Sequence, residues 1–136
     1  MLALAALLAA VAPTAPPSLC LPITAEQDGP VNLTGRLERH VYPGPPNYES
    51  IRRGDRAEPA YILVLDRPAC LQEETVIPAQ APIPRVHLYT GSDTMWPRLR
   101  AAVGHRIRVS GRGFGAITAH HHAPLVVDVA SLQILR

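Results

Sequence analysis

The chain has 136 residues, of which 47% are hydrophobic and 18% are charged, and its formal net charge is +2. This length is typical of one domain and leaves too little chain for a second hydrophobic core. All 13 basic residues are arginines and 11 acidic residues offset them, so the charge is small and dispersed, and no nucleic-acid partner is expected. Arginine without lysine indicates the coding bias of a GC-rich genome rather than a function.

The N-terminal segment is apolar and free of charge as far as residue 25. Its run from Leu2 to Ala12 has the length of a signal-peptide core, is too short to span a membrane, and is followed by the helix-breaking Pro13 and Pro16. We expect residues 1–15 to be a signal peptide that is cleaved between positions 12 and 19, with a retained apolar tail as the alternative. Residues 20–136 would then form one periplasmic or secreted domain without a membrane span.

The sequence contains two cysteines, Cys20 and Cys70. Exported chains meet an oxidising compartment, where thiols pair and an even number leaves none over. We therefore expect a disulfide between Cys20 and Cys70, and the alternative is two free buried thiols. Closing this loop would stabilise the fold by about 4 kcal/mol if the effect comes from chain entropy.

Apolar patterns predict a mainly β chain with one short helix at about 94–103, N-capped from Gly91, Ser92 or Asp93 and ended by Gly104. The strands are expected at 31–37, 60–65, 85–89, 106–110 and 125–129, with 132–135 as an extension of the last. Three strands, a helix and two further strands follow one another in the order of an OB-fold barrel. We therefore expect a small five-stranded OB-like barrel with the helix between strands 3 and 4, and an irregular β-sandwich is the alternative.

Three consecutive histidines, His120, His121 and His122, form the most unusual segment. Residues two apart share a face of an extended chain, so His120 and His122 are candidate ligands of one divalent metal ion while His121 points away. A tight site would need a third ligand from another histidine or a carboxylate, and no other cofactor is expected. The remaining interpretations are an exposed patch that contacts a ligand or partner, and a hydrogen-bonded turn.

The polar stretch 43–58 joins the first two predicted strands and contains several prolines. One interpretation is a recognition loop, in which stiff prolines reduce the entropy lost when Asn47, Tyr48 and Glu49 engage a partner. The other is a loop that folds back on itself through pairs of its own acidic and basic side chains. The residues of these pairs would be Glu49, Asp55, Glu58, Arg52, Arg53 and Arg56.

The predicted strand order places these two segments together. In an OB-like barrel the loop after strand 1 and the loop after strand 4 flank one ligand-facing surface. We therefore expect Asn47, Tyr48 or Glu49 to lie within side-chain reach of at least one of the three histidines, in one polar cleft edged by Tyr48. Histidines have a reference pKa of about 6.5, so binding through this segment is expected to change between about pH 5 and 8.

Several motifs resemble a family of secreted bacterial domains known as domain of unknown function 4431. They are Cys20-Leu, Val31-x-Leu-x-Gly35, the stretch from Pro43 to Ile51, Gly54-Asp55, the strand from Leu63 to Cys70, and Gly104 through Leu125. The resemblance covers most of the exported part of the chain. It implies export, a disulfide and this fold, and it implies no reaction.

The chain contains no Gly-x-Ser-x-Gly elbow, Cys-x-x-Cys pair or His-Glu-x-x-His motif, so no hydrolase or redox chemistry is indicated and an enzyme is not favoured. We expect a non-catalytic binding or interaction module of the bacterial cell envelope. Its partner would be an envelope protein or a small ligand, which the sequence does not identify. The alternatives are a structural accessory domain and a histidine-dependent metal-binding protein or enzyme.

Overall fold

The computed structural model describes residues 19–22, 30–72 and 82–136, so the expected signal peptide lies outside the described residues. The strands are β1 (Leu19–Pro22), β2 (Pro30–Pro43), β3 (Ala57–Gln72), β4 (Ile83–Tyr89), β5 (Arg106–Gly115) and β6 (Leu125–Ile134). The helices are the 3-10 turn η1 (Ile51–Arg53) and the α-helix α1 (Met95–Ala102). Neither of these helices is long and apolar enough to cross a membrane.

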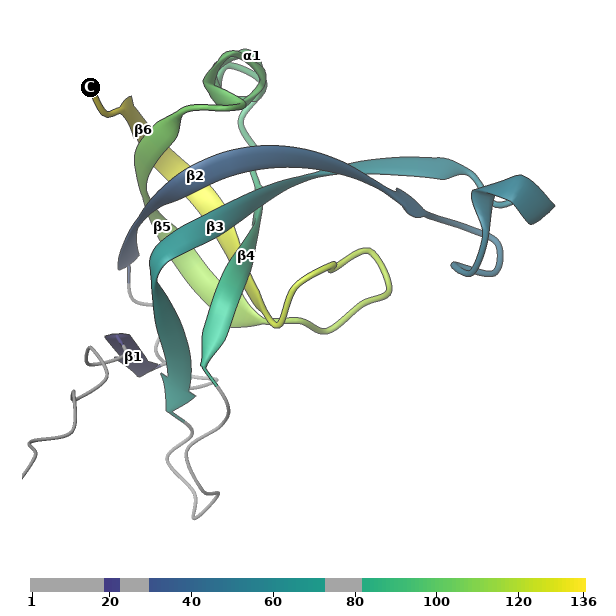
Figure 1. Ribbon diagram of the computed structural model, residues 1–136, viewed down its shortest axis with the longest axis horizontal. Coiled ribbons are helices and arrows are strands. Elements are labelled where there is room, and N and C mark those ends of the chain that lie inside the picture. The colour runs from purple at the N-terminus through teal and green to yellow at the C-terminus, as the bar shows by residue number, and fades with distance from the viewer. Residues whose placement is uncertain (1–18, 23–29, 73–81) are drawn as a thin grey trace, which may run out of the picture.

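Strands β2 to β6 close into a barrel (Figure 1). β2 pairs antiparallel with β3 and with β5, β5 pairs antiparallel with β6, and β6 pairs parallel with β4. An antiparallel pairing between β3 and β4 completes the ring. Because α1 connects the third and fourth barrel strands, the predicted mainly β, five-stranded OB-like barrel is confirmed.

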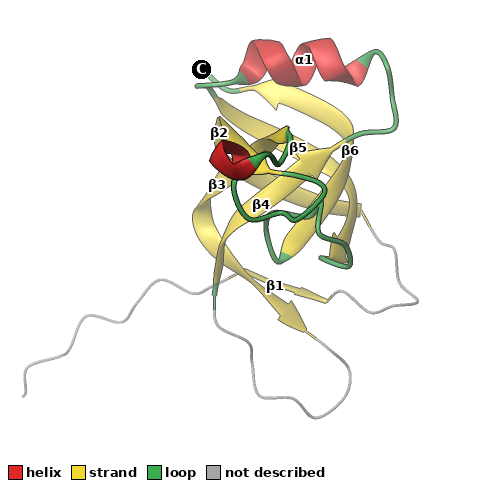
Figure 2. Ribbon diagram, turned by 90° about the vertical axis from the view of Figure 1, so that its right-hand side faces the viewer, coloured by secondary structure: helices red, strands yellow, loops and turns green. Residues whose placement is uncertain are grey.

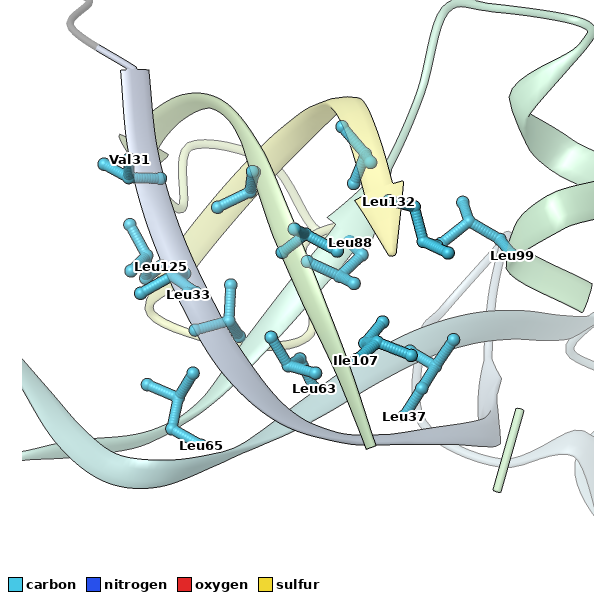
Figure 3. Packing of buried hydrophobic residues seen from close by; sticks show 14 of the residues in the cluster. Val31, Leu33, Leu37, Leu63, Leu65, Leu88, Leu99, Ile107, Leu125 and Leu132 are labelled. Atoms are coloured by element: carbon cyan, nitrogen blue, oxygen red, sulfur yellow. The ribbon is translucent and has the colours of Figure 1, made fainter. Parts of the chain in front are cut away.

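The barrel interior is filled by the alternate apolar residues that the sequence places on one face of each strand. On β2 these are Val31, Leu33 and Leu37, which all lie in the hydrophobic core (Figure 3). Helix α1 lies across one end of the barrel (Figure 2) and buries Leu99 fully, together with two neighbours on the same face. In the described part of the chain, the end of the barrel opposite α1 therefore carries loops and no helix of the core.

The start of the helix differs from the prediction. The expected N-cap among Gly91, Ser92 and Asp93 is wrong, because α1 begins at Met95 after Thr94 and no side chain caps it. Instead the backbone carbonyl of Ser92 accepts a hydrogen bond from the N–H of Met95, at 3.1 Å. A turn that supplies its own carbonyl satisfies a helical N–H without a side-chain acceptor.

The second predicted strand is longer in the structure, because β3 continues to Gln72 where the sequence predicts an end at residue 65. Partners on both sides explain the extension, since β3 pairs with β4 as far as Ala69 and with β1 from Ala69 to Gln72. β1 was not predicted. Its parallel register sets Cys20 opposite Cys70 in the backbone ladder, which supports the expected disulfide; the bond itself stays a prediction.

Three glycines in the second half of β5 permit a bulge, which lies between Ser110 and Gly111 in the structure. A Cβ at Gly111 would lie 1.9 Å from the backbone oxygen of Asp128, so only glycine fits beside β6. At Gly115, four residues along the same strand, a Cβ would meet nothing within 4 Å.

We predict that Gly111→Ala lowers the free energy of unfolding by about 3 kcal/mol, because backbone of β5 and β6 must separate to admit the methyl group. Gly115→Ala is the matched control and should change it by less than about 0.5 kcal/mol. Urea-induced unfolding of both variants measures the difference. Equal stabilities would contradict the close approach of the two strands.

Candidate functional site

β2 and β3 run beyond the barrel as a two-stranded arm, residues 38–60, whose tip carries η1 (Figure 1). The tip is organised around Asp55, which is buried and accepts hydrogen bonds from the backbone N–H groups of Asn47, Glu49 and Ser50 at 2.9, 2.8 and 2.8 Å. Hydrogen bonds from Ser50 and Glu49 hold the pKa of Asp55 below its usual value. The loop does fold back on itself, but Asp55 binds backbone amides and not the arginines that the sequence suggested.

Tyr48 has a backbone φ of 58°, in the left-handed region that bulky residues rarely adopt. Its N–H donates to the carbonyl of Gly44 at 2.9 Å, and the amides on either side of Tyr48 donate to Asp55. These contacts hold a conformation that costs on the order of 1 kcal/mol. The result is that the Tyr48 hydroxyl lies 3.1 Å from Nε2 of His120, which belongs to the loop of residues 116–124.

Glu58 joins the arm to this loop. Its Oε2 lies 2.8 Å from Nδ1 of His120 and its Oε1 lies 2.8 Å from Nε2 of His122. Gly44 makes room for the carboxylate, because a Cβ there would come within 2.9 Å of Oε2. Burial raises the pKa of Glu58, but the hydrogen bonds from His122 and His120 outweigh it, so the net pKa is lowered and the group is ionised at neutral pH.

An ionised carboxylate only accepts hydrogen bonds, and this fixes the protons of its neighbours. His120 donates from Nδ1–H to Glu58, which in the neutral tautomer leaves Nε2 to accept a hydrogen bond from the Tyr48 hydroxyl. His122 donates from Nε2–H. Tyr48, Glu58, His120 and His122 thus form one directional set of hydrogen bonds between the two loops, which we term the Glu58 network.

Aromatic rings pack beneath the Glu58 network. The ring of His122 stacks on Tyr42 with centroids 4.1 Å apart and planes 4° apart, and His87 lies on it at 5.6 Å. His121 contacts His87 and Phe114 edge-on, at 6.3 and 5.5 Å. Four of the six histidines of the chain therefore meet at this end of the barrel.

His121 has a different role from its two neighbours. Its Nδ1 accepts hydrogen bonds from the backbone N–H groups of Ile117 and Thr118 at 3.0 and 3.3 Å, and its own N–H donates to the Thr118 carbonyl at 3.1 Å. The segment is thus a hydrogen-bonded turn and not the extended chain on which the metal hypothesis was built. Within the described ranges no group of three or more His, Cys, Asp or Glu side chains could hold a metal ion.

The predicted meeting of the two loops is confirmed through Tyr48 and His120. Asn47 and Glu49 are exposed and contribute their backbone N–H groups to Asp55, so they support Tyr48 and do not contact the histidines within the described part of the chain. Whether these six predicted residues bind a ligand or partner stays a prediction.

The predicted pairing of Glu58 with nearby arginines is wrong, and Tyr42 is a residue of the site for which no role was predicted. Arginines stand next to Glu58 in the sequence, whereas the histidines that bind it lie 62 and 64 positions away. For Tyr42 a signal exists, since it lies two residues after His40 on an alternating strand and continues the outer face of that strand.

Residues 85–133 match a family described as Domain of unknown function (DUF4431). The resemblance seen in the sequence is confirmed over this region. It contains His87 and all three consecutive histidines, but neither Tyr48 nor Glu58. No curated protein matches the chain.

His87 is the buried member of the site, and its Nδ1 accepts the backbone N–H of His122 at 3.1 Å. Burial, followed by the neighbouring charges of His122 and His121, lowers the pKa of His87 from 6.5 to about 4, although Glu58 opposes the shift. The unfolded chain therefore takes up a proton on this ring near pH 6.5, whereas the folded chain resists it until about pH 4.

We predict that the free energy of unfolding falls as pH decreases from 6.5 toward 4, by about 2 kcal/mol once solvent screening is allowed for. His87→Asn should flatten this dependence, because its side-chain oxygen can replace Nδ1 as acceptor and does not titrate. His105→Asn, at an exposed histidine outside the site, is the control and should leave the slope unchanged. Urea unfolding at several pH values tests both, and an unaltered slope in His87→Asn contradicts the assignment.

Proposed function

We propose that the chain is an exported, non-catalytic binding or interaction module of the bacterial cell envelope. Its contact surface is the barrel end formed by the arm tip, residues 44–56, and the loop of residues 116–124. The uncharged apolar N-terminal run supports export to the periplasm or the medium. The partner is an envelope protein or a small ligand.

The observation that carries this proposal is the Glu58 network. It joins two loops that are far apart in the sequence, and OB-fold barrels bind their ligands between these same two loops. The network leaves part of its surface open, since the side chain of His120 is 58% exposed. Tyr48 and His120 therefore offer a ring, a hydroxyl and an imidazole at a fixed geometry.

The same two segments also carry exposed apolar side chains. Ile51 at the arm tip is 43% exposed and Ile117 in the other loop is 80% exposed. Exposed aliphatic side chains next to oriented polar groups are typical of protein contact surfaces, where the apolar group supplies desolvation energy and the polar group specificity. Among the two classes of partner, this arrangement favours an envelope protein.

A structural accessory role has support in the same contacts, because they also close the end of the barrel. Tyr48→Phe separates the two functions, since it removes one hydroxyl and keeps the ring. A binding role predicts a loss of partner capture with little change in melting temperature. A structural role predicts the reverse.

We predict that Ile117→Arg and Ile51→Arg abolish capture of a partner from envelope extract, in a crosslinking pull-down read by mass spectrometry. Ile134→Arg is the matched control, because Ile134 is 43% exposed like Ile51 but lies at the far end of β6 from the loop 116–124. All three changes are on the surface, so each should shift stability by less than about 0.5 kcal/mol.

The proposed surface would be contradicted if all three variants captured the partner equally well, or if Ile134→Arg lost capture as fully as the other two. Calorimetric titration with Zn²⁺ tests the metal-binding alternative separately. Stoichiometric uptake that His120→Ala or His122→Ala removes would establish that alternative in place of the metal-free module.

A further inference from the structure

The outer edge of β2 loses its neighbouring strand where the arm leaves the barrel. β2 pairs with β5 only as far as Arg36, opposite Arg106. Two more hydrogen bonds follow. The N–H of Leu37 donates to the carbonyl of His105 at 3.0 Å, and the N–H of Gly104 donates to the carbonyl of Leu37 at 2.7 Å. From residue 38 to residue 43 no strand in the described ranges pairs with this edge.

The phase of the β2–β3 ladder identifies the unpaired backbone groups. Gly44 donates its N–H to the carbonyl of Arg56 at 2.7 Å, so every second residue before it turns its N–H and C=O toward β3. The residues between them point their N–H and C=O groups away from β3, as Leu37 does toward His105 and Gly104. Arg39 and Val41 therefore each present an N–H and a C=O that no described residue binds, and Pro43, which has no N–H, ends the series.

The side chains along this edge offer a positive charge at Arg39 and an exposed apolar group at Val41. Arg39 and Val41 lie on the face that carries Tyr61, which stands opposite Arg39 in the ladder and packs near Trp96 at 6.0 Å. Val41 is 48% exposed, which is unusual for an aliphatic residue on the continuation of a core face. A shallow groove lies beside residues 36–40 of this edge and is bounded on its other side by Val103 and Gly104, which follow α1.

We propose that residues 38–43 bind an extended peptide as an added strand, antiparallel to β2 and following the line of β5. Main-chain hydrogen bonds to Arg39 and Val41 would supply the affinity, as in other cases of strand addition. The peptide carries an apolar residue opposite Val41 and, two positions further along the same face, an acidic residue opposite Arg39. This binding site is separate from the Glu58 network and goes beyond the proposed function.

The charges at the edge favour an acidic peptide over a second copy of the chain. Arg36 and Arg39 are exposed and make no ion pair within the described residues. A second copy paired about its own His40 would place its Arg39 diagonally across from the first Arg39, where like charges repel. An acidic residue of a partner peptide would instead meet the positive charge of Arg39. The carboxylate of Glu38 does not compete for this charge, because it is already paired with His40 at 2.6 Å.

The test uses the full chain labelled with ¹⁵N and a capped peptide, Thr-Val-Thr-Glu-Thr, followed by NMR. The amides of Arg39 and Val41 should shift and gain protection from hydrogen exchange, whereas those of Glu38, His40 and Tyr42 are protected before the peptide is added. A peptide with lysine in place of glutamate should bind about threefold more weakly. Val41→Pro should weaken binding at least about tenfold by removing an edge N–H, while Val41→Ala, which keeps that N–H, is the matched control.

Arg39→Glu keeps the test decisive if Val41→Pro fails to fold, because it should reverse the preference between the glutamate and lysine peptides. The proposal is overturned if neither peptide shifts the Arg39 and Val41 amides, or if Arg39→Glu leaves the preference unchanged. It is also overturned if the same amides shift with protein concentration alone, since a second copy would then occupy the edge.

Discussion

One carboxylate, that of Glu58, accepts hydrogen bonds from two imidazoles of another loop and so holds the arm against the barrel. The contact is stable because the carboxylate stays ionised, which in turn fixes the donor nitrogen of each ring. Tyr48 is then able to donate to His120, and the stack of Tyr42, His122 and His87 is held at a defined angle. The surface that we assign to binding depends on this arrangement.

The molecule divides into a barrel that is held by apolar packing and an arm that is held by polar contacts. The barrel core is continuous with α1, whose Leu99 is fully buried. Beyond Leu37 the arm has no such core, and Asp55 and Glu58 organise it through hydrogen bonds. Polar contacts are directional but individually weak, so the arm is the part of the described chain whose geometry is most sensitive to pH and to single substitutions.

Much of the fold could be predicted because it rests on local patterns. Alternation of Val31, Leu33 and Leu37 identified a half-buried strand, and the order of elements identified the barrel and hence the meeting of the two loops. The partner of Glu58 could not be predicted in this way, because nearby arginines are equally suitable in charge and only the tertiary fold brings the histidines closer. Of the three interpretations of the histidine segment, the hydrogen-bonded turn is the one that the structure shows, because backbone N–H groups donate to His121; the extended chain behind the metal hypothesis is wrong.

The tautomers of the clustered histidines test the Glu58 network most directly. A long-range ¹H–¹⁵N spectrum of the imidazoles, recorded at about pH 8 where free histidine is neutral, distinguishes the protonated nitrogen in each ring. The network requires His120 to be protonated at Nδ1, and His122 at Nε2, because each of these atoms donates to Glu58. A proton on Nε2 of His120, or the averaged signals of a freely rotating ring, would contradict the account.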